Sequence, residues 1–251
     1  MTVALVVLAA GLIMLLIEQG APGRAWPRVA GWWPRAIGLN AAQAGIVLLA
    51  GVTWDGWLQG LSLWALEDVL GPTGGAIAGY FAITFVYYWW HRWRHENPLL
   101  WRWLHQVHHS PQRLEVLTSF YKHPLEMAGN ALLSSVILYL LCGLSPVSAA
   151  ATLLTGLAEL FYHWNVRTPH WLGYVVQRPE SHCLHHQSGW HRQNYSDLPL
   201  WDMLFGTFHN PRRRHFTCGF GDHAEQRLAA MLRGRRVDGQ ANSDRRTPSR
   251  P

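Results

Sequence analysis

Long apolar runs recur along the chain and constrain its fold more than any other feature. A bilayer core is about 30 Å thick, so a helix of about 20 apolar residues crosses it. Five runs approach this length, at residues 2–17, 36–52, 74–90, 128–142 and 146–162. They predict an all-α, multi-pass membrane protein with four to five apolar helices. The last two runs flank the turn Gly143-Leu144-Ser145-Pro146, which predicts a helical hairpin, either fully spanning or re-entrant.

The first run is interpreted as a retained membrane helix rather than a secretory signal peptide. No Lys or Arg precedes it and no clean small-residue cleavage site follows. The next segment, residues 20–35, alternates prolines with arginines and is typical of a basic interfacial loop. Residues 54–68 are amphipathic and rich in tryptophan, which favours the headgroup level of a bilayer.

Charge is scarce and mostly positive. Charged residues make up 14% of the chain, against about 25% in an average soluble domain. The net charge of +6 comes largely from arginines beside apolar segments, which favours anionic lipid headgroups over nucleic acid as the partner. The positive-inside rule places the Arg24–Arg35 loop, the His91–Arg102 region and the C-terminal segment in the cytoplasm, and the Glu67/Asp68 loop outside. The three cysteines form no CxxC pair, so neither a disulfide framework nor a thiolate zinc site is expected.

Histidines gather beside the apolar runs. The clusters read HRWRH (His91, His95), HQVHH (His105, His108, His109) and HCLHH (His182, His185, His186). Neutral imidazole is the commonest metal ligand among side chains, and residues three and four apart share one face of a helix. Each trio could bind one metal, with the adjacent histidine serving a second. Eight imidazoles exceed what one ion needs, so the clusters predict two metals in a histidine-rich helical cap on the cytoplasmic helix ends.

A solvated helix face, or simple headgroup contacts, would also place histidines beside apolar runs. Three clusters with matched spacing, each beside an apolar run, argue against both. A hydrolytic zinc site typically carries HExxH, with the Glu as general base. Here the residues after the leading histidines are Arg92, Gln106 and Cys183. Because imidazole suits zinc, copper and iron, the ligands alone do not choose the metal.

The chain resembles the fatty acid hydroxylase / sterol desaturase superfamily of membrane-bound di-iron oxygenases. The resemblance covers roughly residues 75–210 and agrees in motif order and spacing. The matching pieces are HRWRH at 91–95, HQVHHS at 105–110, HWN at 163–165, HCLHH at 182–186, NY at 194–195 and WDMLFGT at 201–207. The last histidine motif departs from the usual HRxHH, because Cys183 replaces Arg and Gln187 stands where Ser is common. Some relatives have a further histidine where this chain has Arg167.

The resemblance implies O2-dependent hydroxylation or desaturation of a C–H bond in a fatty acyl, sterol or related lipid. It implies two iron ions, with zinc possible in a purified form. The implied ligands, which would carry the catalysis, are His91, His95, His105, His108, His109, His163, His182, His185 and His186. No cytochrome b5-like HPGG segment or ferredoxin-like cysteine set appears. We therefore expect a separate electron donor of the ferredoxin or cytochrome b5 type, with its reductase. A membrane zinc hydrolase and a non-catalytic metal-binding membrane protein remain the alternatives.

Several residues near the motifs are candidates for supporting roles. His123 is a possible substitute ligand or an ordinary interfacial histidine. His191 is the best of the weaker histidines, which also include His170, His209, His215 and His223. Glu159, Asn165 and Asp202 are candidates for holding the ligand imidazoles, although Glu159 also suits an interfacial salt bridge and Asp202 a turn or a helix cap. The predicted divisions are an N-terminal membrane part (1–72), a catalytic domain (73–228) and a disordered basic tail (229–251).

Overall fold

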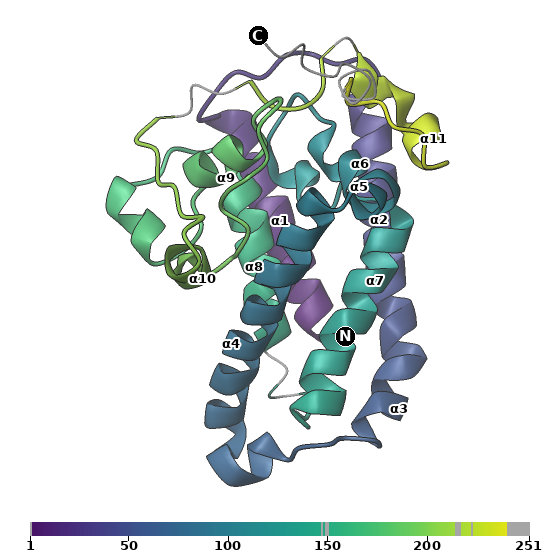
Figure 1. Cartoon of the computed structure of the whole chain (residues 1–251), viewed down its shortest axis with the longest axis vertical. Helices are drawn as coiled ribbons and strands as arrows, with labels where there is room; N and C mark the ends of the chain where they lie inside the picture. Colours follow the sequence, from purple (N-terminus) through teal and green to yellow (C-terminus); the bar gives the residue numbers. More distant parts are fainter. Residues whose placement is uncertain (1, 147, 149–150, 214–216, 222, 240–251) are drawn as a thin grey trace, which may run out of the picture.

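The computed structural model describes residues 2–146, 148, 151–213, 217–221 and 223–239. Its regular elements are helical, apart from one isolated bridge between Gln187 and Cys218. The long helices run side by side along the vertical axis of Figure 1. They are α1 (Thr2–Gly20), α2 (Trp32–Val52), α4 (Leu66–Glu96), α7 (Pro124–Ser135) with its π-helical extension η3 (Val136–Leu141), and α8 (Ala151–His163). The predicted all-α membrane fold is confirmed.

Three of the described helical segments are long and apolar enough to cross a bilayer. They are Trp32–Val52, Leu66–Glu96 and Pro124–Leu141. The other two apolar helices, α1 and α8, are shorter or less continuous in the described residues. Helix α2 packs against α7, and α8 packs against α1 and α4. Large apolar side chains such as Leu12, Leu49 and Ile77 remain more than half exposed, which suits helices whose outer faces contact lipid.

Helix α4 begins earlier and ends later than its apolar run. Glu67 and Asp68, expected in a loop, lie in its first turn, before a break at Gly71 (φ 71°) and Pro72. A carboxylate oxygen of Glu67 accepts from the backbone N–H of Ser145 at 2.7 Å, which closes the bundle at the end far from the histidines. There Gly143 has φ 63°, and a Cβ at this position would collide with the carbonyl of Trp64.

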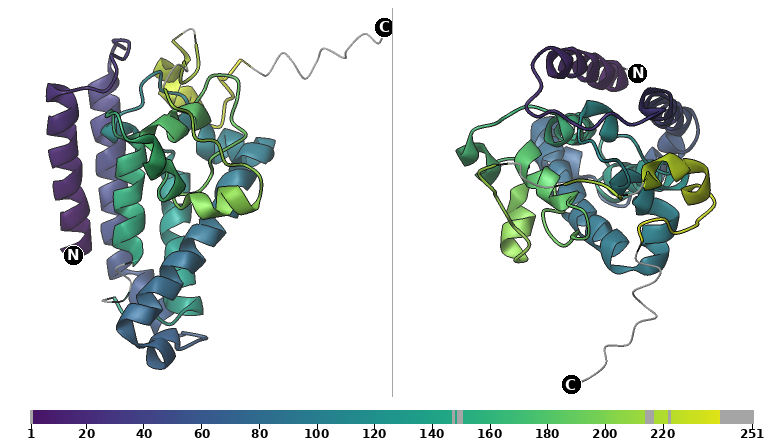
Figure 2. Two further views of the ribbon diagram at one scale, coloured as in Figure 1. Left: turned by 90° about the vertical axis from the view of Figure 1, so that its left-hand side faces the viewer. Right: turned by 90° about the horizontal axis from the view of Figure 1, so that it is seen from above.

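A cap of short helices covers the opposite end of the bundle (Figures 1 and 2). Its segments are α5 (Pro98–Leu100), η1 (Trp101–His105), α6 (Gln106–His109), η2 (Val116–Thr118), η5 (His170–Tyr174), α9 (Pro179–His185), α10 (Pro199–Leu204), η6 (Ala224–Arg227) and α11 (Leu228–Met231). The short helix α3 (Trp54–Gln59) lies at the other end.

Buried contacts attach the cap to the bundle. Trp32 of α2 stacks on Tyr121 with ring centroids 5.3 Å apart, and its Nε1 donates to Glu115. Arg35 of α2 forms an ion pair of 2.9 Å with Glu225. These contacts fix the cap directly above the ends of the long helices.

Residues 229–239, which the sequence assigns to a disordered tail, pack against the cap. Met231 is fully buried and Val237 is 7% exposed. Residues 240–251, the rest of that predicted tail, lie outside the described part of the chain.

Candidate metal centre

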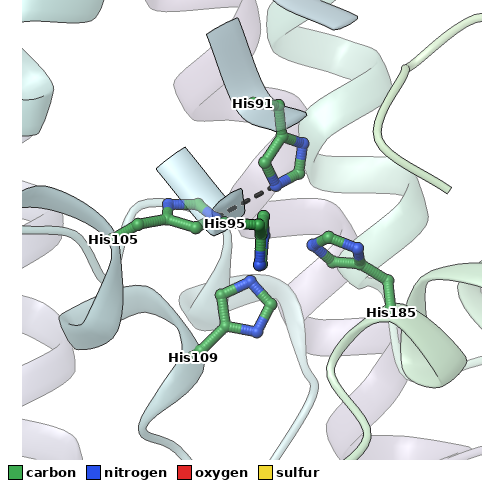
Figure 3. Close-up of side chains that lie close together, drawn as sticks. All are labelled: His91, His95, His105, His109 and His185. Carbon is green, nitrogen blue, oxygen red and sulfur yellow. Dashed lines mark hydrogen bonds between the residues drawn. The ribbon is translucent and has the colours of Figure 1, made fainter. Parts of the chain in front are cut away.

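The nine histidines predicted as ligands come together in two compact groups. The five-histidine group contains His91, His95, His105, His109 and His185. The four-histidine group contains His108, His163, His182 and His186. Within each group the candidate ligand nitrogens all lie within 4.8 Å of one another. Figure 3 shows the rings of the five-histidine group pointing toward a common centre, with His91 and His95 from α4 and the others from η1, α6 and α9.

Each HxxHH motif divides its histidines between the two groups. His105 and His109, four residues apart, join the five-histidine group, whereas His108 between them joins the other. In the second motif the pair His182 and His186 belongs to the four-histidine group and His185 crosses to the five-histidine group. A step of four residues returns close to the same helix face, whereas neighbouring positions point about 100° apart. Each motif therefore supplies candidate ligands to both groups, rather than one trio to each.

Local sequence signals begin the helices that present these side chains. After α4 ends, Oδ1 of Asn97 accepts from the N–H groups of Leu99 and Leu100, and Pro98 occupies the first helical position. This combination starts a new helix in a new direction. Pro179 likewise begins α9. Residues Trp101–His105 form the π-helical turn η1, which is wider than an α-helical turn and leads from α5 into α6.

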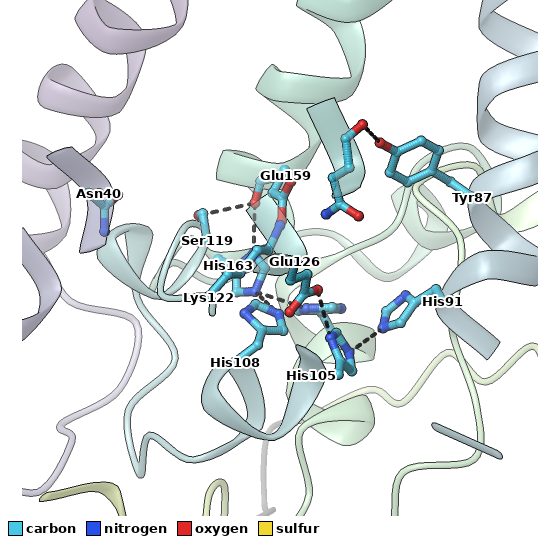
Figure 4. Close-up of polar contacts among 12 residues, drawn as sticks. Asn40, Tyr87, His91, His105, His108, Ser119, Lys122, Glu126, Glu159 and His163 are labelled. Carbon is cyan, nitrogen blue, oxygen red and sulfur yellow. Dashed lines mark hydrogen bonds and ion pairs between the residues drawn. The ribbon is translucent and has the colours of Figure 1, made fainter. Parts of the chain in front are cut away.

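Four ligand candidates donate their Nδ1–H to an oxygen behind the ring. His91 donates to the carbonyl of Tyr195 at 2.7 Å, and His185 to that of Gln193 at 2.7 Å. His163 donates to the carbonyl of Glu159 at 2.8 Å, and His105 to Oε1 of Glu126 at 2.9 Å (Figure 4). Such bonds fix the tautomer and turn the other nitrogen, Nε2, toward a metal.

The Nε2 atoms converge. Those of His91 and His105 lie 3.0 Å apart in the five-histidine group. In the four-histidine group, Nε2 of His182 lies 3.1 Å from Nε2 of both His163 and His186. His91 and His105 both donate through Nδ1, so each has only a lone pair at Nε2, and these two lone pairs face one another. Shared binding of a cation resolves that arrangement.

Further nitrogens are buried without a hydrogen-bond partner. They include both ring nitrogens of His95 and of His109, and Nε2 of His185. Buried polar atoms in proteins are normally paired, and exceptions point to an ion or ligand. Together with an all-imidazole donor set, which suits iron, copper and zinc, these orphaned atoms show that the residues present fit two metal ions.

Burial also keeps the cap histidines in the ligand-ready neutral form. Desolvation lowers the pKa of His185 to about 3. It likewise lowers the pKa of His105, His108 and His186 well below the usual range, and the neighbouring positive or histidine side chains act in the same direction. Metals bind neutral imidazole, so these histidines do not have to lose a proton before a metal binds.

Glu126 is a site residue that sequence reasoning missed. It is fully buried near the start of α7, where its carboxylate contacts both His105 and the guanidinium of Arg94. Figure 4 shows its carboxylate beside the His105 ring, joined to it by a dashed line. An acid at the start of a membrane helix is costly and usually functional. That same argument, which singled out Glu159, would have found it.

Two of the three predicted supporting residues, Glu159 and Asp202, reach a ligand histidine through a backbone carbonyl. The carbonyl of Glu159 accepts from His163, whereas its carboxylate pairs with Lys122. Asp202 accepts from the N–H groups of Tyr195 and Ser196 and from the Thr207 hydroxyl, so it holds the Tyr195 peptide that contacts His91. Desolvation raises the pKa of Asp202 to about 6, against the opposing effect of these three donors.

Asn165 lies farther from the centre. Its side chain exchanges hydrogen bonds of 3.1 and 2.8 Å with the backbone of Arg24, which holds the α1–α2 loop against the end of α8.

The remaining histidines lie outside the two groups. Nδ1 of His123 accepts from the N–H of Leu125 and caps α7, while its Nε2 donates to the carbonyl of Leu232. His191 lies nearest, with its ring centroid 4.7 Å from that of His109. His170 contacts Asn210, His209 donates its backbone N–H to Asn194, and His223 precedes η6 with φ 57°. His215 lies outside the described residues.

Comparison with known proteins agrees with this geometry. Three relatives illustrate the similarity: an ornithine lipid hydroxylase of Rhizobium tropici (35% identical over 142 residues), a sphingolipid C4-hydroxylase of Schizosaccharomyces pombe (29% over 138) and a human alkylglycerol monooxygenase (29% over 143). The matches cover 55%, 53% and 52% of this chain but only 42%, 47% and 30% of the respective relatives. No solved structure matches. The family model described as fatty acid hydroxylase matches residues 76–207, which include both histidine groups, and the chain therefore belongs to the fatty acid hydroxylase family.

Proposed function

We propose that this protein is a membrane-bound di-iron oxygenase that hydroxylates or desaturates a C–H bond of a membrane lipid. The observation that carries the proposal is the convergence of nine imidazoles in two adjacent groups at the end of membrane-spanning helices. The relatives named as lipid hydroxylases and monooxygenases favour the same class of reaction.

The proposed ligands to the two irons are the members of the two histidine groups. When bound, the iron pair supplies a redox centre that reduces O2 and allows attack on an unactivated C–H bond. For hydroxylation the balance is R–H + O2 + 2 e⁻ + 2 H⁺ giving R–OH + H2O, so electrons must enter from a donor. The chain's own part is to hold the imidazoles neutral and oriented, through the Nδ1 bonds to Tyr195, Gln193, Glu159 and Glu126. Seven of the nine proposed ligands are buried, and His91 and His95 are partly buried, which limits the access of bulk water to the centre.

A membrane lipid as substrate is supported by where α10 lies. This cap helix packs on the spanning helix α4, with Trp201 5.1 Å from Phe85 and Phe205 5.1 Å from Tyr88, measured between ring centroids. The side chain of Leu204 on α10 is 63% exposed. An apolar cap surface beside a spanning helix belongs at bilayer depth, so a lipid chain can approach the histidine groups without leaving the membrane.

The histidine end is proposed to face the cytoplasm, because the basic α1–α2 loop lies at the same end (Figure 2). The test is an Arg28→Cys variant treated with a membrane-impermeant maleimide. Labelling only after the membrane is opened supports this orientation. Labelling of intact cells contradicts it.

The experiment that tests the function is metal analysis of detergent-purified protein expressed with ample iron, with Mössbauer spectra and O2 uptake after reduction. Two irons per chain that are reoxidised by O2 support the proposal. One zinc per chain, with no O2 reaction and hydrolysis of lipid esters, would favour a hydrolase. Metal binding without either reaction would favour a non-catalytic metal-binding protein. Lipid analysis of cells with and without the gene then identifies the substrate.

A further inference from the structure

Trp101 lies directly beside the five-histidine group. It begins η1, and its side chain is 5% exposed. Its ring centroid is 5.3 Å from those of both His95 and His109, and 6.1 Å from that of His105. The indole therefore contacts three of the five proposed ligands of one metal position.

The other edge of the indole is tied to the C-terminal segment. Its Nε1–H donates to Oδ2 of Asp238 at 2.8 Å. Nε of Arg236 in turn donates to both carboxylate oxygens of Asp238 at 3.0 Å, and the Arg236 side chain is 23% exposed. A continuous set of contacts thus leads from the protein surface through Asp238 and Trp101 to the imidazoles.

The surface over this route is a hollow of about 480 Å³ with a basic lining. Its lining residues are Pro98, Leu99, Arg102, Gly234, Arg235 and Arg236. Among the described residues, neither Arg102 nor Arg235 forms an ion pair with a carboxylate. The apolar Leu99 beside them is 61% exposed.

The hollow is built into the fold rather than formed by a loose tail. Nε2 of Gln106 donates to the carbonyl of Arg235 at 3.1 Å, which holds this arginine beside α6. Gly234 (φ 66°) packs so closely on the Trp103 ring that a Cβ would lie 2.6 Å from it. The negative groups nearby are already paired: Asp238 with Arg236, and Glu96 with Arg92 at 2.7 Å.

We propose that this basic hollow is the docking site of an acidic one-electron carrier, and that Trp101 conducts its electrons to the five-histidine group. The inference rests on the proposed function, since it presumes a redox-active metal. The arginine lining is complementary to an acidic protein surface, and such complementarity increases the association rate and fixes the docked orientation. The exposed leucine supplies an apolar contact within the charged rim. Anionic lipid headgroups share the charge preference, but they do not account for the aromatic route beneath the hollow.

The electron balance requires two docking events for each turnover. A reduced carrier, such as a [2Fe–2S] ferredoxin, is oxidised by one electron at each event. The two electrons and two protons reduce one oxygen atom of O2 to water, while the other enters the lipid. The Trp101 indole bridges the transfer and ends each turnover unchanged.

The first test measures docking without catalysis. Oxidised plant-type ferredoxin is titrated onto the full chain in neutral-lipid nanodiscs, with the dissociation constant measured by surface plasmon resonance. Arg235→Glu should weaken binding about tenfold or more at low salt, and added salt should reduce the difference. Arg28→Glu is the matched control, because Arg28 is an exposed arginine in the α1–α2 loop, which lies at the same end of the bundle (Figure 2), and this variant should bind as the parent does.

Two results of this test overturn the proposal. One is equal affinity of the Arg235→Glu and Arg28→Glu variants for ferredoxin. The other is that Arg235→Glu abolishes the thermal stabilisation caused by short-chain phosphatidylglycerol while leaving ferredoxin binding unchanged. The second result would assign the hollow to lipid headgroups.

The second test follows electron transfer in the iron-loaded protein by stopped-flow spectroscopy. The rate of reduction by ferredoxin is divided by the rate of reduction by dithionite, a small reductant that needs no protein docking. This ratio should fall about tenfold in Arg235→Glu and in Trp101→Leu, and less in Trp101→Phe, which keeps an aromatic ring. An unchanged ratio in all three variants overturns the proposal. Failure of dithionite-reduced parent protein to consume O2 instead refutes the proposed function, independently of docking.

Discussion

Oε1 of Glu126 lies 2.9 Å from Nδ1 of His105, and the same carboxylate oxygen contacts the buried guanidinium of Arg94. The carboxylate therefore serves two purposes: it orients a proposed metal ligand and it neutralises a charge within the protein. The hydrogen bond from Nδ1 of His105 to this carboxylate turns Nε2 of His105 toward Nε2 of His91, 3.0 Å away.

Replacing Glu126 should weaken metal binding without removing a ligand. Glu126→Gln retains an acceptor for His105 but loses the charge that pairs with Arg94, so iron affinity should fall about 10- to 100-fold. Glu126→Ala leaves Arg94 buried without its partner and should also destabilise the fold by about 3–5 kcal/mol. Iron titration and thermal melting measure the two effects.

The matched control is Glu96→Gln, because Glu96 pairs with Arg92 on the same helix but its side chain is 52% exposed. It should change iron affinity and stability little. Parental iron affinity in Glu126→Gln would contradict an orienting role.

Helical spacing is local, so the sequence alone identified the histidine motifs whose side chains the structure brings together. It could not predict how each HxxHH motif divides between two metal positions, because that depends on where α6, α8 and α9 meet. The pairing of Glu126 with Arg94 could not be predicted for a similar reason: the two residues are 32 positions apart, and nothing local pairs them. Composition made residues 229–239 look like part of a tail, whereas long-range contacts such as the one between Trp101 and Asp238 place them on the cap.

Metal content should distinguish His95 from His123. His95→Ala removes a member of the five-histidine group whose ring nitrogens have no other partner, so we expect loss of about one of two irons. His123→Ala should keep both irons and lose the α7 cap and the hydrogen bond to Leu232, at a cost of about 1–2 kcal/mol. Iron analysis with Mössbauer spectra makes the measurement. Loss of iron from His123→Ala would instead identify that residue as a ligand.

Asp202→Asn should disturb the centre through the backbone. The carboxylate accepts from two backbone N–H groups and one hydroxyl, and an amide turns one acceptor into a donor that faces an N–H. We expect a stability loss of about 1–3 kcal/mol and reduced iron retention, because the Tyr195 carbonyl positions His91. Asp68→Asn, on the exposed first turn of α4, is the control. Unchanged melting and iron content in Asp202→Asn would exclude this route.

The metal-free protein should lose stability as the pH falls below about 6.5. In the folded state, burial lowers the pKa of His105, His108, His109, His182, His185 and His186, with that of His185 reduced to about 3. Unfolded histidines have pKa values near 6.5, so the unfolded chain binds more protons below this pH. Stability is therefore fully present above about pH 7 and falls by about 1.4 kcal/mol per pH unit for each such group.

Thermal melting of metal-free protein in detergent, between about pH 8 and pH 5, tests this dependence. A matched variant, His186→Gln, removes one of the groups whose pKa is lowered. Below pH 6.5 the stability of this variant should fall less steeply than that of the parent, by about 1.4 kcal/mol per pH unit. A melting temperature independent of pH over this range would show that the folded protein protonates these histidines as readily as the unfolded chain does, and would contradict their burial as neutral ligands.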